Sequence, residues 1–247
     1  MKLLVCVSKT PETTTKIQLT SDGSEIDRSG VQYIMNPYDE WYALVRALEL
    51  KEAAGGTVTL LNVGPAENDP IIRKGLAIGA DDAVRIDVSD EKDSLYTARQ
   101  IAEYSRDQAY DLILFGKETI SYNGSEVGAM VAEFLDWPYI GDATHLEVEG
   151  TAATVTRDIE GGEEVIEVQT PLALSAAKGM AEQRIPNMRG IMMAKRKPLE
   201  VVPPVDFPDT TRIAGYHKPA EKGSVKLIDP ENMDELVRLL HEEAKVI

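Results

Sequence analysis

The chain has 247 residues, a formal charge of −16 and 43% apolar residues. This length predicts one α/β domain, or a domain with an extension, and the apolar content suffices for a sizeable core. The acidic balance argues against DNA or RNA as a partner, because nucleic-acid phosphates require a basic surface. The single cysteine, Cys6, excludes an internal disulfide framework and fits a reducing compartment. We find no signal peptide and no apolar run near the ~20 residues of a membrane span, and we therefore expect a cytoplasmic protein that is not membrane-embedded.

Short apolar runs alternate with amphipathic stretches in the first half of the chain. The runs predict buried strands at residues 2–7, 58–63, 83–88 and 112–115. Polar residues 8–29 leave room only for a short hairpin. Strands that alternate with helices are typical of a parallel sheet with crossover helices.

Polar residues followed by proline or by an apolar face predict where the helices begin. We expect the N-caps to be Asn36 (with Pro37 at the first helical position), Asp69 (with Pro70) and Ser94. A fourth helix is expected from about residues 123–125, because Val127, Met130, Val131 and Phe134 share one face.

The pattern changes after Pro138. Residues 143–148, 153–159 and 164–169 predict strands that add an antiparallel hairpin to the sheet, and residues 172–176 predict a last apolar strand. Residues 201–222 hold few apolar anchors and predict an extended arm. A terminal helix capped by Asp229 follows, and its apolar face must be buried on its own domain or, more often after such an arm, on a partner subunit.

The sequence shows no convincing catalytic or metal-binding set. The three histidines, His145, His217 and His241, are scattered, and no pair has metal-ligand spacing. No nucleophile motif or phosphate-binding glycine motif is present, and Cys6 lies in an apolar run typical of a buried structural thiol. The chain is therefore expected to bind rather than to catalyse.

The carboxyl ends of the predicted strands are the expected binding site, because ligands of parallel sheets lie there beside helix N-termini. Residues 6–8, 36–39 and 63–66 could surround a purine, and the helix that begins near Asn123, Gly124 and Ser125 could bind phosphate. Each segment also has an ordinary interpretation as a cap or a turn. The Glu126 carboxylate would oppose a phosphate unless it points away.

Several motifs occur in an order and at spacings that are more specific than any one of them. They are VQYIMNPYD at residues 31–39, LLNVGPA at 60–66, GLAIGA at 75–80, GKETI at 116–120, GxxxAxFLDWP at 128–138, TRDIEGGEEVIEVQTPLAL at 156–174 and IMMAKRKPLE at 191–200. With these motifs the chain resembles the β subunit of electron transfer flavoprotein over nearly its whole length. The resemblance implies a Rossmann-like α/β fold of the adenine-nucleotide-hydrolase-like type, extended by the hairpin and by a C-terminal arm with a terminal helix.

The resemblance also implies a function and its partners. The family forms a heterodimer with an α subunit and shuttles electrons from flavin dehydrogenases to an acceptor through FAD held mainly by the α subunit. The β subunit has no catalytic residues of its own and carries a structural AMP or, in electron-bifurcating members, a second FAD. By position, residues 1–193 correspond to the nucleotide-binding domain and residues 194–247 to an arm and helix that wrap the partner.

The family's functional residues map onto two sets of positions. By position, the nucleotide pocket comprises Cys6, Asn36, Pro37, Tyr38, Asp39, Val63, Ser121, Tyr122, Asn123, Gly124, Ser125, Glu126, Val127, Gly128, Ala129, Met130, Val131 and Ala132. The segment that docks to dehydrogenases comprises Arg184, Ile185, Met188 and Arg189, with Met188 at an exposed loop tip. Residues 121–127 depart from the family's phosphate loop, which usually begins with Asp.

Two other classes of function fit a fold of this type. A free-standing nucleotide-binding sensor would be a stable monomer without flavin, and the long arm with its amphipathic helix argues against it. An ATP-using enzyme of the adenine-nucleotide hydrolase type would need a glycine-rich loop after the first strand, where the chain has Ser8, Lys9, Thr10 and Pro11.

Overall fold

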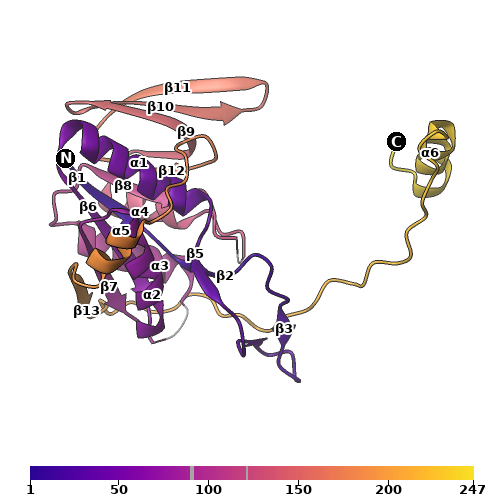
Figure 1. Cartoon of the computed structure of the whole chain (residues 1–247), viewed down its shortest axis with the longest axis horizontal. Coiled ribbons are helices and arrows are strands. Elements are labelled where there is room, and N and C mark those ends of the chain that lie inside the picture. The colour runs from indigo at the N-terminus through magenta and orange to yellow at the C-terminus, as the bar shows by residue number, and fades with distance from the viewer. Residues whose placement is uncertain (90–91, 121) are drawn as a thin grey trace. The chain divides into compact units, whose positions relative to one another are not determined.

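A nine-stranded, mostly parallel sheet forms the centre of the protein in the computed structural model, which describes residues 1–89, 92–120 and 122–247. The strand order is β11-β10-β9-β12-β8-β1-β6-β7-β13. The strands are β1 (Lys2–Cys6), β6 (Thr57–Gly64), β7 (Asp82–Asp87), β8 (Leu112–Gly116), β9 (Tyr139–Glu149), β10 (Ala152–Ile159), β11 (Gly162–Gln169), β12 (Leu172–Ala176) and β13 (Leu199–Val202). The predicted fold class is confirmed, and Figure 1 shows the sheet with its helices.

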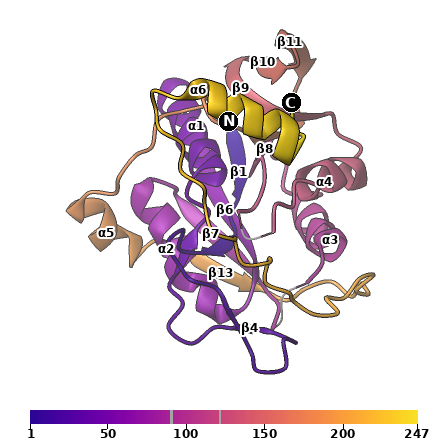
Figure 2. The same ribbon diagram turned by 90° about the vertical axis from the view of Figure 1, so that its right-hand side faces the viewer.

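Helices cover both faces of the sheet, which explains why its central strands are continuous apolar runs. Leu3 and Val5 of β1 face the core beneath α1 (Asp39–Ala54) and α2 (Asp69–Ile78). The alternate residues Leu4 and Cys6 face the core beneath α3 (Ser94–Ser105) and α4 (Val127–Leu135). Figure 2 shows the two helix pairs on opposite sides of the sheet.

The predicted helices exist, but their predicted caps are wrong. The helix after Asn36 and Pro37 begins only at Asp39, because the buried Asn36 side chain is directed to another loop. A 3-10 turn, η1 (Ala66–Asn68), precedes α2, which therefore has Asn68 rather than Asp69 at its N-cap.

Two further caps are also displaced from their predicted positions. Asp93 replaces Ser94 as the cap of α3 because its carboxylate accepts the Tyr96 N–H at 2.7 Å. In the terminal helix, Asn232 replaces Asp229 because its Oδ1 accepts the Glu235 N–H.

The strand β9 joins the parallel and antiparallel parts of the sheet. It pairs in parallel with β12 and antiparallel with β10, and β10 in turn pairs antiparallel with β11. The predicted hairpin is thus confirmed, and β9 begins earlier than expected, at Tyr139. A register shift interrupts the β9–β12 pairing near Asp142, which has a left-handed φ of 58°.

Two small ribbons, a short helix and an edge strand accompany the central sheet. One ribbon pairs β2 (Lys9–Pro11) with β5 (Tyr33–Met35), and the predicted short hairpin forms from β3 (Gln18–Leu19) and β4 (Ile26–Asp27). The helix α5 (Met188–Ala194) packs on α2, and β13 pairs in parallel with β7.

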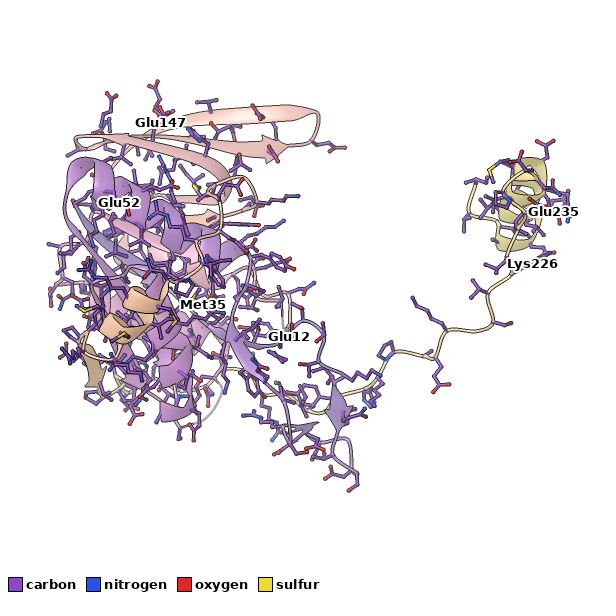
Figure 3. All side chains as sticks on the ribbon, in the orientation of Figure 1. Glu12, Met35, Glu52, Glu147, Lys226 and Glu235 are labelled. Carbon is purple, nitrogen blue, oxygen red and sulfur yellow. The ribbon has the colours of Figure 1, made fainter. Side chains whose placement is uncertain are left out.

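The contacts divide the chain into two units. The first comprises Met1–Gln18 and Asp27–Ala214, and the second comprises Leu19–Ile26 and Gly215–Ile247. The second unit contains the terminal helix α6 (Met233–Leu239), which continues into one π-helical turn, η2 (Leu240–Ala244). Lys226 and Glu235, labelled in Figure 3, lie 4.0 Å apart in this unit.

Candidate functional site

The predicted site lies where the direction of strand addition reverses. The chain proceeds from β1 to β6 and β7 on one side, and it then returns to place β8 on the other side of β1. Such a switch point opens a crevice at the carboxyl ends of the strands, and the N-terminus of α1 lies there. Gly116, the last residue of β8, is so close to α1 that a Cβ atom on it would lie 2.8 Å from the Glu40 backbone nitrogen.

Asn36 connects the segment before α1 to the loop after β8. Its side chain is fully buried, and Nδ2–H donates to the Glu118 carbonyl at 2.7 Å. Its Oδ1 has no hydrogen-bond partner among the described residues. Buried polar atoms are nearly always satisfied, and an orphan acceptor at a strand end therefore indicates a site for a donor from a bound molecule.

The other residues of this segment are more accessible. The Asp39 carboxylate accepts the Glu118 N–H at 3.4 Å, and burial raises the pKa of Asp39. The Pro37 carbonyl accepts a hydrogen bond from the Gln183 side chain at 2.6 Å, and Tyr38 is half exposed.

Glu40, which was not predicted as a site residue, has the most unusual environment at this end of the sheet. It is 5% exposed, and its two carboxylate oxygens accept the Ser8 N–H at 2.7 Å and the Ser8 hydroxyl at 2.5 Å. Burial raises the pKa of Glu40 to about 8, although these hydrogen bonds favour the charged form. The sequence gives no signal for this, because an acidic residue in the first turn of a helix is ordinary.

An apolar wall forms the other side of the predicted pocket. Cys6 and Val63 belong to the same hydrophobic cluster as Val127, Met130 and Val131 of α4. Burial raises the pKa of the Cys6 thiol well above its ordinary value, and the nearby Glu40 carboxyl adds to this rise. Cys6 is therefore a packing residue and not a reactive thiolate.

Backbone hydrogen bonds connect Asn123 and Gly124 of the predicted phosphate loop to Thr119. The Thr119 N–H donates to the Gly124 carbonyl at 3.0 Å, and the Asn123 N–H donates to the Thr119 carbonyl at 2.7 Å. Asn123 has a left-handed φ of 53°, which asparagine tolerates better than most residues. Ser121 lies outside the described residues, and Tyr122 is 66% exposed.

The helix beyond this loop begins later than predicted. Its first residue is Val127, and Glu126 occupies the N-cap position without a side-chain cap. Its first turn has N–H groups without intrahelical acceptors, as at any helix N-terminus. Gly128 is buried against Phe115 and Tyr139, whereas Ser125, Glu126 and Ala129 are exposed.

Three further polar residues near these strand ends were not predicted as site residues. Asn68 donates to Asn62 at 2.9 Å, and Asn62 donates to the Val7 carbonyl at 2.8 Å. Asn68 Oδ1 and Thr119 Oγ1 are buried without a partner among the described residues. Asn62 had a usable signal, because a polar residue within an apolar strand run is seldom buried without a reason.

The predicted docking segment presents apolar side chains to solvent. Ile185 is 87% and Met188 74% exposed, and Met188 begins helix α5 rather than lying within a loop. Arg184 is instead held in place: its guanidinium forms two hydrogen bonds with Glu52 (labelled in Figure 3) at 2.6 and 2.9 Å, and its carbonyl accepts the Trp41 indole N–H. Arg189 is exposed on the first turn of α5.

Two observations bear on metals and membranes. No group of three or more His, Cys, Asp or Glu side chains within the described residues is arranged to hold a metal ion. No helix among those residues combines the length and apolarity that a membrane crossing requires.

Comparisons with known proteins agree with this architecture. The family described as electron transfer flavoprotein domain matches residues 24–207. The electron transfer flavoprotein subunit beta of Bacillus subtilis is 39% identical, with all of both chains covered. The subunit of the same name from Homo sapiens is 30% identical, with all of this chain and 99% of the relative covered. The chain therefore belongs to the electron transfer flavoprotein family, as a beta subunit.

Proposed function

We propose that this chain pairs with an electron transfer flavoprotein α subunit and carries one AMP as a structural ligand. FAD, held mainly by the α subunit, would supply the redox chemistry by accepting electrons from dehydrogenases and passing them on. This chain would bind, orient and enclose these nucleotides, and none of its residues would act as a catalyst. The observation that carries the AMP assignment is the buried Asn36, whose Oδ1 lacks a donor at the switch point.

The site has the two chemical characters that an adenine base needs. An adenine presents an exocyclic amino group, which can donate to an amide oxygen such as Asn36 Oδ1. Its ring faces are apolar and suit the wall that contains Cys6, Val63 and Met130. The ribose and phosphate would then extend toward residues 121–132.

The start of α4 supports the phosphate position. Free N–H groups and the positive end of the helix dipole favour an anion there. Ser125 adds a hydroxyl, and the exposed Glu126 side chain is free to turn to solvent, where its charge is screened. AMP bound in this way would stabilise the folded subunit by mass action.

Within residues 194–247, the part that follows β13 is proposed to wrap the α subunit, because β13 itself belongs to the central sheet. In the second unit, Val225 and Leu227 are 87% and 91% exposed, and Met233 and Val237 on α6 are about half exposed. Such apolar exposure indicates an interaction surface. The arm would therefore supply a large share of the heterodimer interface.

The exposed segment around Met188 is proposed to dock to flavin dehydrogenases. A thioether side chain is flexible and polarisable, so it adapts to apolar pockets of different shape. The Arg184–Glu52 pair would fix the base of this segment while Ile185 and Met188 remain free to insert.

Counting the nucleotides released by the denatured heterodimer tests the ligand assignment. The chain is co-expressed with its α subunit, and the released nucleotides are identified by mass and counted. One FAD and one AMP per dimer are expected. Two FAD and no AMP would overturn the AMP assignment and favour an electron-bifurcating member, whereas a stable, flavin-free monomer would favour the sensor module.

A further inference from the structure

Glu40 is a buried residue that connects the segments around the predicted nucleotide pocket. Its carboxylate binds both the N–H and the hydroxyl of Ser8, the second residue after β1. The Asn36 amide also hydrogen-bonds to the Glu40 carboxyl. One side chain thus ties together two of the segments predicted to surround the base.

The backbone leaves this side chain little freedom to move. Gly116 at the end of β8 approaches α1 so closely that a Cβ atom there would be 2.8 Å from Glu40 Cγ. The side chain is therefore held between β8 and the Ser8 segment, almost without contact with water. A carboxyl held in this way cannot relieve a negative charge by rotating into solvent.

We propose that Glu40 is a positioning residue that retains a proton in the nucleotide-loaded subunit, and that loss of this proton loosens the pocket and weakens nucleotide binding. The inference rests on the proposed nucleotide site. It adds a proton-linked control of ligand retention, which operates through Ser8 and Asn36 rather than by direct contact with the nucleotide.

The charged and titratable neighbours favour the neutral form. Asp39 of α1 lies near Glu40, and its negative charge opposes the ionisation of Glu40. Cys6 of β1 also lies near Glu40, but its raised pKa keeps the thiol neutral. Lys117 and Glu118 after β8 and Asp142 on β9 act on the neighbouring Asp39. Among these groups only Lys117 is cationic, and its effect on Asp39 is exceeded by burial.

The charge of the ligand determines the sign of the linkage. A nucleotide over the ends of β1 and β8 would bring a phosphate anion to the end of the sheet where Glu40 is already buried. This negative charge disfavours the carboxylate and raises the pKa of Glu40. By reciprocity, the protonated protein must bind the nucleotide more tightly than the ionised one.

The expected change in nucleotide affinity depends on how far the bound ligand raises the pKa of Glu40. If binding raises the pKa of Glu40 by one unit, the affinity falls by up to about tenfold as the pH rises through the two values. Because the pKa of Glu40 is about 8 without a ligand, the fall is expected above pH 8.

The test measures nucleotide affinity of the intact heterodimer from pH 6.5 to 9.5 by exchange with labelled AMP. The wild-type affinity should fall about tenfold across this range, and Glu40→Gln, which stays neutral, should remove the fall. Glu49→Gln, on the same helix but one-third exposed and paired with Arg46, should keep the wild-type profile. Equal profiles for the wild type and Glu40→Gln would overturn the proposal.

A second variant keeps the test decisive if Glu40→Gln does not fold. Ser8→Ala removes one donor to the carboxylate, which should move the midpoint of the affinity fall to higher pH. An unchanged midpoint would contradict the proposal. The released nucleotide is identified by mass in the same preparation, and if it is FAD, the AMP assignment fails while FAD retention still tests Glu40.

Discussion

Replacing Gly116 with alanine should disturb the nucleotide site through the backbone of α1. The added Cβ would lie 2.8 Å from the Glu40 backbone nitrogen and 3.1 Å from Asp39 Cβ. An ordinary contact starts at 3.4 Å, so the start of α1 or the end of β8 would have to move by about 0.6 Å. A helix backbone cannot swing aside as a side chain can, and overpacking of this kind costs about 1–3 kcal/mol.

The cost should be visible in the melting temperature of the heterodimer. At about 2–4 °C per kcal/mol for a chain of this size, the expected decrease is roughly 2–12 °C at equal protein concentration. Gly162→Ala is the matched control, because nothing lies within 4 Å of its added Cβ. If Gly116→Ala melts within about 1 °C of the wild type, the close packing of β8 on α1 does not constrain the site as argued.

Three further variants test the base site, the docking segment and the cap of α3. Asn36→Ala should lower the AMP content of the purified heterodimer, measured by mass after denaturation, because the buried amide is proposed to bind the base; full occupancy would contradict this. Met188→Glu should leave the flavin content unchanged but slow flavin reduction by the cognate dehydrogenase, measured by stopped flow, and an unchanged rate would exclude this docking site. Asp93→Ala should destabilise the protein by about 1–2 kcal/mol in thermal unfolding at pH 7, because the α3 cap and the bonds from Thr210 and Thr211 are lost. Partial burial opposes the ionisation of Asp93, but these hydrogen bonds lower its pKa below the unfolded value. The contribution of Asp93 to stability should therefore be present above pH 4 and decline in stronger acid. If Asp93→Ala lost the same stability at pH 7 and in strong acid, this origin would be contradicted.

The order of the central elements could be predicted from the sequence because each buried strand is a short apolar run closed by glycine or polar residues. The short elements α5 and β13 were not predicted. Which polar residue caps a helix was less predictable, since neighbouring candidates compete and tertiary contacts decide. Asn36 has the right local pattern for a cap, but its amide bonds to Glu118, which is 82 residues away. Asp93 displaced Ser94 because its carboxylate reaches the Tyr96 N–H.

The site was predictable only in part for the same physical reason. Strand ends follow from local pattern, and these placed Cys6 and Val63 in the same region. The burial of Glu40 depends on how closely β8 approaches α1, a distance set by Gly116 after the fold has formed. Met188 is exposed, as its polar neighbours predicted, but the short helix that it begins has too few residues for a periodic pattern.

The two sides of the crevice have different characters because different helices cover them. The side toward α4 is an apolar wall, since Cys6 and Val127 belong to the core of that face. The side toward α1 is polar, since Asn36 and Glu40 lie where the chain leaves a strand and enters a helix. A ligand that satisfies both must have one apolar face and a polar edge, which is the character of a nucleobase. A substitution on the α4 side should therefore weaken nucleotide binding in proportion to the apolar area removed, whereas one on the α1 side should also change the pH dependence of binding.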